Sequence, residues 1–169
     1  MKRSSLAATA IALTFFTASP TLAAENASLA PVYGAAEGWL NGSATPQTLK
    51  GKVVVVDVFT FDCYNCKNVV PQLKALNATE SKDVAIVGVH SPETSFEKNR
   101  ANVVSNLRTQ GITWPVALDN SFAVWNAYGV NAWPTQLFFD RHGKLRKTIV
   151  GDSQDDAVKA TIRELVAEK

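Results

Sequence analysis

Cysteine is scarce in this sequence, and its scarcity limits the roles that it can have. Of the 169 residues only two, Cys63 and Cys66, are cysteines, and two residues separate them. A disulfide across so short a loop removes little conformational entropy from the unfolded chain. A fold held by several structural disulfides is therefore excluded, and we interpret the pair as working chemistry rather than as an inert local disulfide.

Histidine and excess charge are scarce too. His90 and His142 are the only histidines, whereas a structural zinc site usually needs four protein ligands. We therefore predict no metal site. Removing Lys2 and Arg3 takes the basic residues from 17 to 15, against 15 acidic residues, so the rest of the chain is neutral. That balance gives no reason to expect a nucleic acid or an acidic membrane surface as a partner.

Long apolar runs are missing as well. The best candidate, residues 6–16, is shorter than the roughly 20 residues of a membrane-spanning helix. It follows Lys2 and Arg3 and precedes Pro20 and Ala23, an order typical of a secretory signal peptide. We predict a signal peptide over residues 1–23 and a single domain over residues 24–169. Membrane association would need an uncleaved signal sequence, and a lipoprotein is excluded because no cysteine lies near Ala23.

The two cysteines occupy the junction between a predicted strand and a predicted helix. Val53–Phe59 is rich in β-branched residues, as expected of a strand buried on both faces. From Cys66 onward, apolar residues recur at steps of three and four through Leu76, which predicts an amphipathic helix. Free N–H groups at a helix N-terminus stabilise an anion, and the thiolate is the nucleophile in disulfide exchange. We predict that Cys63 is the exposed attacking thiol and that Cys66, one turn deeper, is the resolving thiol.

Three further features in order make the stretch resemble the active site of the thioredoxin superfamily. Asp57 lies six residues before Cys63, where the family has a buried acid, and Pro71 lies five residues after Cys66, where it has a helix proline. The segment Trp133-Pro134-Thr135 is similar to the cis-proline segment that faces the disulfide in that superfamily.

The resemblance implies roles for these residues. It assigns Asp57 as the general base for Cys66, and we expect burial to raise the pKa of this carboxyl. It assigns Trp133, Pro134 and Thr135 to partner binding, together with the dipeptide Tyr64-Asn65 between the cysteines. An outward-facing Asp57 and a trans Pro134 in an ordinary loop are the alternatives.

The remaining pattern predicts an α/β fold with a mixed central β-sheet flanked by helices. Strands are predicted over residues 84–89, 114–119, 135–140 and 145–150, and helices over 95–110, 122–128 and a C-terminal segment capped by Asp152 or Ser153. The helix and strand inserted before Pro134 resemble the TlpA, ResA and CcmG type of periplasmic thiol–disulfide oxidoreductase. That resemblance also implies a short N-terminal hairpin. We expect Glu93 and Glu97 to be solvated and leave them out of the site.

The direction of electron transfer follows from the residues around the pair. Tyr64-Asn65 supplies no cation to stabilise a thiolate, and Asp62 adds a negative neighbour. We therefore predict a reductant of disulfide-bearing proteins, of the type used for apocytochrome c or copper-site cysteines. Its only redox group would be the Cys63–Cys66 disulfide, with no bound cofactor, and a membrane thiol donor would restore the dithiol because the periplasm is oxidising.

Two alternatives come from other readings of the same thiols. Two thiolates are soft ligands for Cu(I), so the chain could be a copper-binding module. It could also be an oxidase or isomerase that donates its disulfide to folding proteins. A peroxidase is a weaker alternative, because no peroxidatic cysteine environment is recognisable in the sequence.

Overall fold

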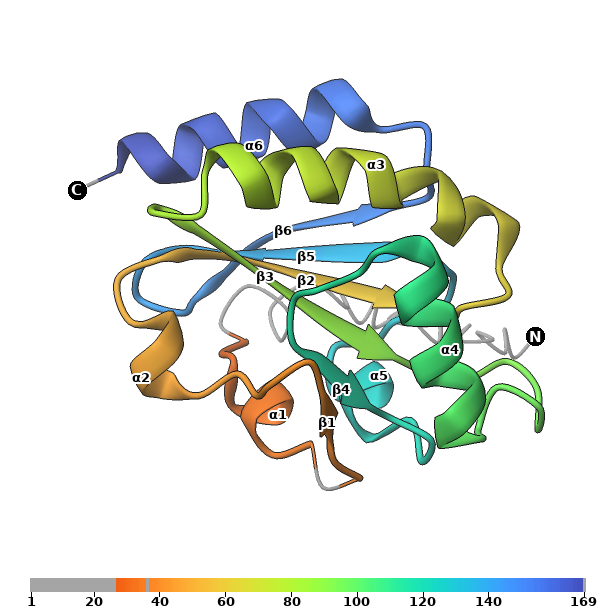
Figure 1. Cartoon of the computed structure of the whole chain (residues 1–169). Helices are drawn as coiled ribbons and strands as arrows, with labels where there is room; N and C mark the ends of the chain where they lie inside the picture. Colours follow the sequence, from red (N-terminus) through yellow and green to blue (C-terminus); the bar gives the residue numbers. More distant parts are fainter. Residues whose placement is uncertain (1–26, 36, 169) are drawn as a thin grey trace, which may run out of the picture.

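A six-stranded mixed sheet forms the centre of the molecule (Figure 1). The computed structural model describes residues 27–35 and 37–168, so the predicted signal peptide, residues 1–23, lies outside the described residues. The elements follow in the order α1 (Ala30–Tyr33), β1 (Trp39–Leu40), α2 (Pro46–Leu49), β2 (Val53–Phe59), α3 (Tyr64–Thr79), β3 (Val84–His90), α4 (Arg100–Gln110), β4 (Val116–Leu118), α5 (Ala123–Ala127), β5 (Thr135–Phe139), β6 (Leu145–Val150) and α6 (Asp155–Ala167). The thioredoxin-like fold predicted from the sequence is confirmed.

Strand β2 is central because all seven of its residues are buried. In the sheet order β1-β4-β3-β2-β5-β6 it pairs in parallel with β3 and antiparallel with β5. Alternate side chains point to opposite faces of a strand, and the valines of β2 divide accordingly between two apolar cores. Val53 and Val55 join the core beneath α3, α4 and α6, whereas Val54 and Val56 join the core that α1, α2 and α5 cover.

The carboxyl ends of β2 and β3 lie at the same edge of the sheet, where α3 begins (Figure 1). In open α/β sheets, ligands and reactive groups gather outside this edge. The inserted elements α4 and β4, predicted from the sequence, follow β3 and place β4 in parallel beside it. The residues from β2 to α3 and the loop after β3 therefore meet at one end of the molecule.

The predicted N-terminal hairpin is wrong for the described residues. Trp39 and Leu40 do form a short strand, but it pairs antiparallel with β4, where Trp39 lies opposite Ala117. Strand β4 would otherwise be the edge of the sheet, and its unpaired backbone groups are satisfied by β1. The partner of this strand therefore comes from about 77 residues further along the chain, between Trp39 and Val116.

Two predicted helix starts are also wrong. The helix predicted over residues 95–110 begins at Arg100, because Asn99 caps it and the preceding residues form turns around the Glu97 carboxylate. Helix α6 begins after Gln154 without a side-chain cap, since the predicted cap Asp152 instead accepts a hydrogen bond from Asn68 of α3. Within the part of the chain that the structure describes, no helix is long and apolar enough to span a bilayer.

Candidate active site

Cys63 is the N-cap residue of α3. Its Sγ accepts a hydrogen bond from the Cys66 backbone N–H at 3.2 Å. The helix begins at Tyr64, before the apolar pattern that starts at Cys66, because the thiol itself satisfies one of the free N–H groups of the first turn. Both cysteines are free thiols; Cys63 is partly exposed, whereas Cys66 is 3% exposed.

The Cys66 thiol is held in its protonated form. Burial raises the pKa of this thiol most, and the hydrogen bond with Cys63 and the charge of Asp57 raise it further. A hydrogen bond with the backbone of Thr60 partly offsets these effects. The two thiols therefore differ as predicted in exposure, and Cys66 needs a proton acceptor before it can attack.

Asp57 is buried at the middle of β2, with 3% of its surface exposed. Burial raises the pKa of its carboxyl to about 7, and the neighbouring Gln136 side chain moderates the rise. The Asp57 Oδ1 and Gln136 Nε2 atoms are both buried without a hydrogen-bond partner among the described residues. The alternative of an outward-facing aspartate is thus contradicted and the expected direction of the pKa shift is confirmed, while the role as general base stays a prediction.

The peptide bond between Trp133 and Pro134 is cis, as the resemblance implied. The Trp133 ring is held on two sides: its Nε1–H donates to the Ser91 carbonyl at 3.0 Å, and its centroid lies 4.4 Å from that of Trp125. Thr135 is 1% exposed and its hydroxyl donates to the Ala132 carbonyl. Its side chain therefore has a packing role, and a direct contact of Thr135 with a partner stays a prediction.

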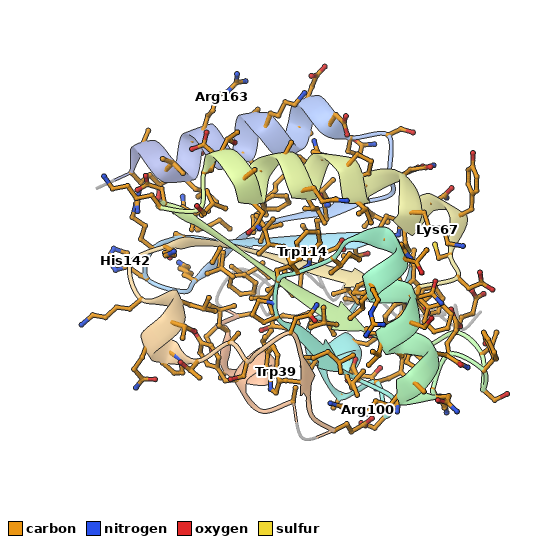
Figure 2. All side chains as sticks on the ribbon, in the orientation of Figure 1. Trp39, Lys67, Arg100, Trp114, His142 and Arg163 are labelled. Atoms are coloured by element: carbon orange, nitrogen blue, oxygen red, sulfur yellow. The ribbon has the colours of Figure 1, made fainter. Side chains whose placement is uncertain are left out.

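The dipeptide Tyr64-Asn65 is exposed beside Cys63, and 77% of the Tyr64 surface is accessible. The negative neighbour Asp62 forms an ion pair with Lys67 at 3.1 Å. Figure 2 shows Lys67 at the N-terminal end of α3. The sequence analysis counted Asp62 alone, so this pair is a correction: the charge beside Cys63 is partly compensated, although an exposed pair contributes little energy.

Glu97 is the residue that sequence reasoning missed. We expected it to be solvated, yet it is 1% exposed, and one of its oxygens accepts hydrogen bonds from the Thr60 hydroxyl and from the Asp62 N–H at 3.2 Å. Its other oxygen accepts from the N–H of Thr94 at 2.8 Å. A signal was present, because Thr94-Ser95-Phe96-Glu97 has the spacing of a capping box. Glu93, by contrast, has an exposed side chain as predicted.

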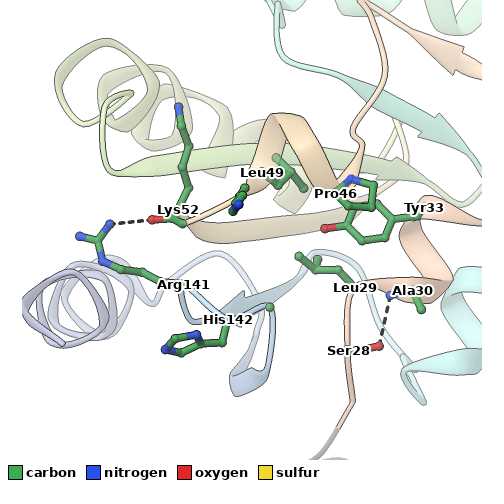
Figure 3. A pocket seen from close by; sticks show the side chains of 12 residues that line it. Ser28, Leu29, Ala30, Tyr33, Pro46, Leu49, Lys52, Arg141 and His142 are labelled. Carbon is green, nitrogen blue, oxygen red and sulfur yellow. Dashed lines mark hydrogen bonds between the residues drawn. The ribbon is translucent and has the colours of Figure 1, made fainter. Parts of the chain in front are cut away.

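A pocket of about 330 Å³ lies away from the cysteines (Figure 3). It includes His142, which Figure 2 places at the end of the molecule opposite to Lys67. Its cations are already engaged: Arg141 donates to the Gly51 carbonyl at 2.8 Å, and Lys52 donates to the Ser81 carbonyl at 2.7 Å. Across the described residues there is no group of three His, Cys, Asp or Glu side chains that could hold a metal ion.

The fold and the paired cysteines define a protein of thioredoxin-like class, and the chain belongs to the Redoxin family, which matches residues 40–165. It is 32% identical over 147 residues to Protein DipZ of Mycobacterium tuberculosis; the match covers 84% of this chain but only 21% of DipZ. It is 25% identical over 133 residues to the thiol-disulfide oxidoreductase YkuV of Bacillus subtilis, covering 78% of this chain and 90% of YkuV. A solved thiol-disulfide isomerase from Corynebacterium glutamicum superposes with a TM-score of 0.70 at 25% identity, covering 78% of this chain and 92% of that one.

Proposed function

We propose that this chain is a thiol–disulfide oxidoreductase that reduces disulfides of protein partners through Cys63 and Cys66. The capping contact of Cys63 carries the proposal: its Sγ lies at the first turn of α3, 3.2 Å from a backbone N–H. Negative charge that forms on this sulfur is stabilised by the helix N-terminus. Cys66, buried behind it, is protected until a mixed disulfide forms.

The exchange proceeds in two displacements. The Cys63 thiolate attacks one sulfur of the partner disulfide, which forms a mixed disulfide and releases the other partner sulfur as a thiolate. Asp57 takes the proton of Cys66, whose thiolate then attacks Cys63 Sγ and releases the second partner sulfur. The partner gains two electrons and, from solvent and Asp57, two protons, while Cys63 and Cys66 become a disulfide.

The reducing direction is supported by the groups near the pair. Tyr64 and Asn65 place no cation between the cysteines, and the buried acids Asp57 and Glu97 lie next to the segments that carry them. Negative charge near a thiolate disfavours the reduced form and lowers the reduction potential. The printed function of YkuV, a thiol-disulfide oxidoreductase, agrees with the class of reaction.

The finer parts of the proposal concern location and partners. The N-terminal signal pattern supports export to the periplasm, where a membrane thiol donor would have to restore the dithiol. Disulfides of apocytochrome c or of a copper-site protein are the proposed substrates, by resemblance to the TlpA, ResA and CcmG type. The chain spans a fifth of DipZ, 21%, so the activity of that longer protein is not transferred to this one.

Trapping of mixed disulfides tests the exchange role. In a Cys66→Ala variant the second displacement cannot occur, so proteins of a periplasmic extract should accumulate as dithiothreitol-sensitive adducts on Cys63. The double variant Cys63→Ala/Cys66→Ala is the control and should form none. If the single variant collects no more adducts than the double variant, the exchange role is wrong.

The reduction potential of the pair tests the direction. Equilibration of the purified protein with dithiothreitol or glutathione buffers should give a value of about −270 mV or lower, as for thioredoxin. A value close to about −120 mV, that of a strong oxidant, would instead make disulfide donation the function.

A further inference from the structure

The Glu97 carboxylate joins two segments that are far apart in the sequence. One oxygen accepts from the Thr60 hydroxyl and the Asp62 N–H, both in the turn that follows β2. The other accepts from the N–H groups of Glu93 and Thr94 at 2.9 and 2.8 Å, and from the Thr94 hydroxyl at 3.1 Å, all in the loop that follows β3. Five donors on one buried carboxylate form a link that can be broken only by leaving several of them unpaired.

The turn that this carboxylate holds is the one that carries both thiols. Asp62 directly precedes Cys63, and the backbone of Thr60 hydrogen-bonds with the Cys66 thiol. The contacts of Glu97 therefore lie one residue from the attacking cysteine and on the residue that touches the resolving cysteine. No other carboxylate in the described part of the chain accepts hydrogen bonds from this turn, apart from the exposed pair between Asp62 and Lys67.

The ground beneath the turn is rigid. His90 is fully buried, its ring stacks on Phe61 at 5.5 Å with an interplanar angle of 17°, and its Nε2 lies 3.5 Å from the Thr60 hydroxyl. Burial lowers the pKa of His90 to about 4, so the imidazole is neutral at pH 7 although the Glu97 charge opposes that shift. Burial alone would raise the pKa of Glu97, but the hydrogen bonds from Thr60, Thr94 and Asp62 lower it, so the carboxylate is ionised.

We propose that Glu97 is a positioning residue for disulfide exchange, which fixes the Thr60 to Cys63 turn and sets the reduction potential of the Cys63–Cys66 pair. This inference rests on the proposed function. A fixed turn holds the two cysteines in one arrangement and so favours closure of their disulfide. The ionised carboxylate beside the turn also disfavours a thiolate on Cys63. Both effects stabilise the disulfide relative to the dithiol, and both make the pair more reducing.

Glu97→Gln separates this role from a general effect of charge. An amide has a single oxygen, so it cannot accept from both segments, and its N–H groups oppose the donors that remain. Glu93→Gln is the matched control, because it removes the same charge four residues away on an exposed side chain whose carboxylate receives none of these hydrogen bonds. Thr60→Val is the second test, because it removes one donor, keeps the shape of the side chain and leaves the Glu97 charge in place.

The measurement is the equilibrium in which the dithiol and oxidised glutathione give the Cys63–Cys66 disulfide and two reduced glutathiones. We expect Glu97→Gln to make the disulfide about tenfold less favoured, a rise of about 30 mV in reduction potential. Thr60→Val should act in the same direction by about threefold, because one hydrogen bond is lost. Glu93→Gln should match the wild type.

The outcomes are separable. If the wild-type pair forms no disulfide with glutathione over the whole range of buffers, the proposed function fails. If the wild type equilibrates but Glu97→Gln and Thr60→Val both coincide with Glu93→Gln, the exchange function stands and the positioning role is wrong. If Glu97→Gln does not fold, as judged by its circular dichroism, the isosteric Thr60→Val variant decides.

Discussion

Two buried acids beside the cysteines titrate in opposite directions, and the difference lies in their donors. Asp57 is desolvated and its Oδ1 meets no donor among the described residues, so burial raises the pKa of this carboxyl to about 7. Glu97 is as deeply buried, but its five donors lower the pKa below the usual range. A hydrogen-bonded carboxylate keeps its charge, whereas an unpaired one is stabilised by a proton. The first suits a fixed anchor and the second suits a proton acceptor at neutral pH.

The raised pKa of Asp57 predicts a specific pH dependence of stability. Because the folded protein favours protonated Asp57, the contribution of this group is complete below about pH 4 and is lost as the pH rises to about 7. Asp57→Asn stays neutral, so the variant should exceed the reduced wild type above pH 7 in free energy of unfolding, by up to roughly 4 kcal/mol. Urea denaturation under dithiothreitol between pH 4 and 8 measures the difference.

Asp156→Asn provides the control for that series, since Asp156 is exposed in the first turn of α6. Its effect should stay near 0.5 kcal/mol at every pH above 5. A difference between Asp57→Asn and the wild type that does not change with pH would contradict the assignment of a raised pKa to Asp57.

At the scale of elements, the short helix α5 is tied to the active-site edge by one side chain. Asp119 is 2% exposed and accepts from the N–H groups of Val124 and Trp125 at 2.9 and 3.0 Å, and from the Ser91 hydroxyl at 2.8 Å. The Ser91 carbonyl in turn accepts from Trp133, against which Trp125 packs. The residue before Pro134 is therefore placed by an acid 14 residues earlier in the sequence, at the end of β4.

Asp119→Ala should loosen this connection. It removes the acceptor for two N–H groups of the first turn of α5 and for the Ser91 hydroxyl, all of them buried or nearly so. We expect the free energy of unfolding to fall by about 2–3 kcal/mol, measured by urea denaturation. Asp155→Ala, an exposed change in the first turn of α6, should lower it by about 0.5 kcal/mol. Equal losses in the two variants would show that the Asp119 contacts contribute nothing special.

At the scale of the whole molecule, the sheet separates two cores that share their central strand. Helices α3, α4 and α6 cover one face and α1, α2 and α5 the other (Figure 1). Because β2 contributes alternate valines to both faces, neither core can be exposed while the other stays packed around the same strand. A domain built in this way is expected to unfold in a single transition.

Val55→Ala and Val56→Ala test this unity from opposite sides of β2. Each removes two methyl groups from a side chain that is 0% exposed, so each should lower the free energy of unfolding by about 2–3 kcal/mol. In both variants circular dichroism and tryptophan fluorescence should give the same urea midpoint. Val104→Ala, at a position that is 38% exposed, should change it by about 0.5 kcal/mol or less. Two midpoints in either core variant would mean that the faces unfold separately.

The sequence by itself determined the features that depend on neighbours along the chain. The valine run of Val53–Phe59 can be buried only as a central strand, the spacing of Cys63 and Cys66 puts one thiol outside and one inside the first turn of a helix, and Gly143 supports the positive φ of the turn between β5 and β6. Asp57 was predictable because a carboxyl in such a strand cannot escape burial. The class of fold followed from the order of these local patterns.

Only the tertiary structure decided the features that depend on who fills a vacant hydrogen bond. The backbone of β4 recruited Trp39 and Leu40 in place of a hairpin, Asn68 engaged the Asp152 that would have capped α6, and Lys67 paired with Asp62. Glu97 is the clearest case: its local capping pattern was visible, but the donors of Thr60 and Asp62 lie more than 30 residues earlier in the chain. A polar group is buried where donors from distant segments converge, and that convergence exists only once the sheet has brought the segments together.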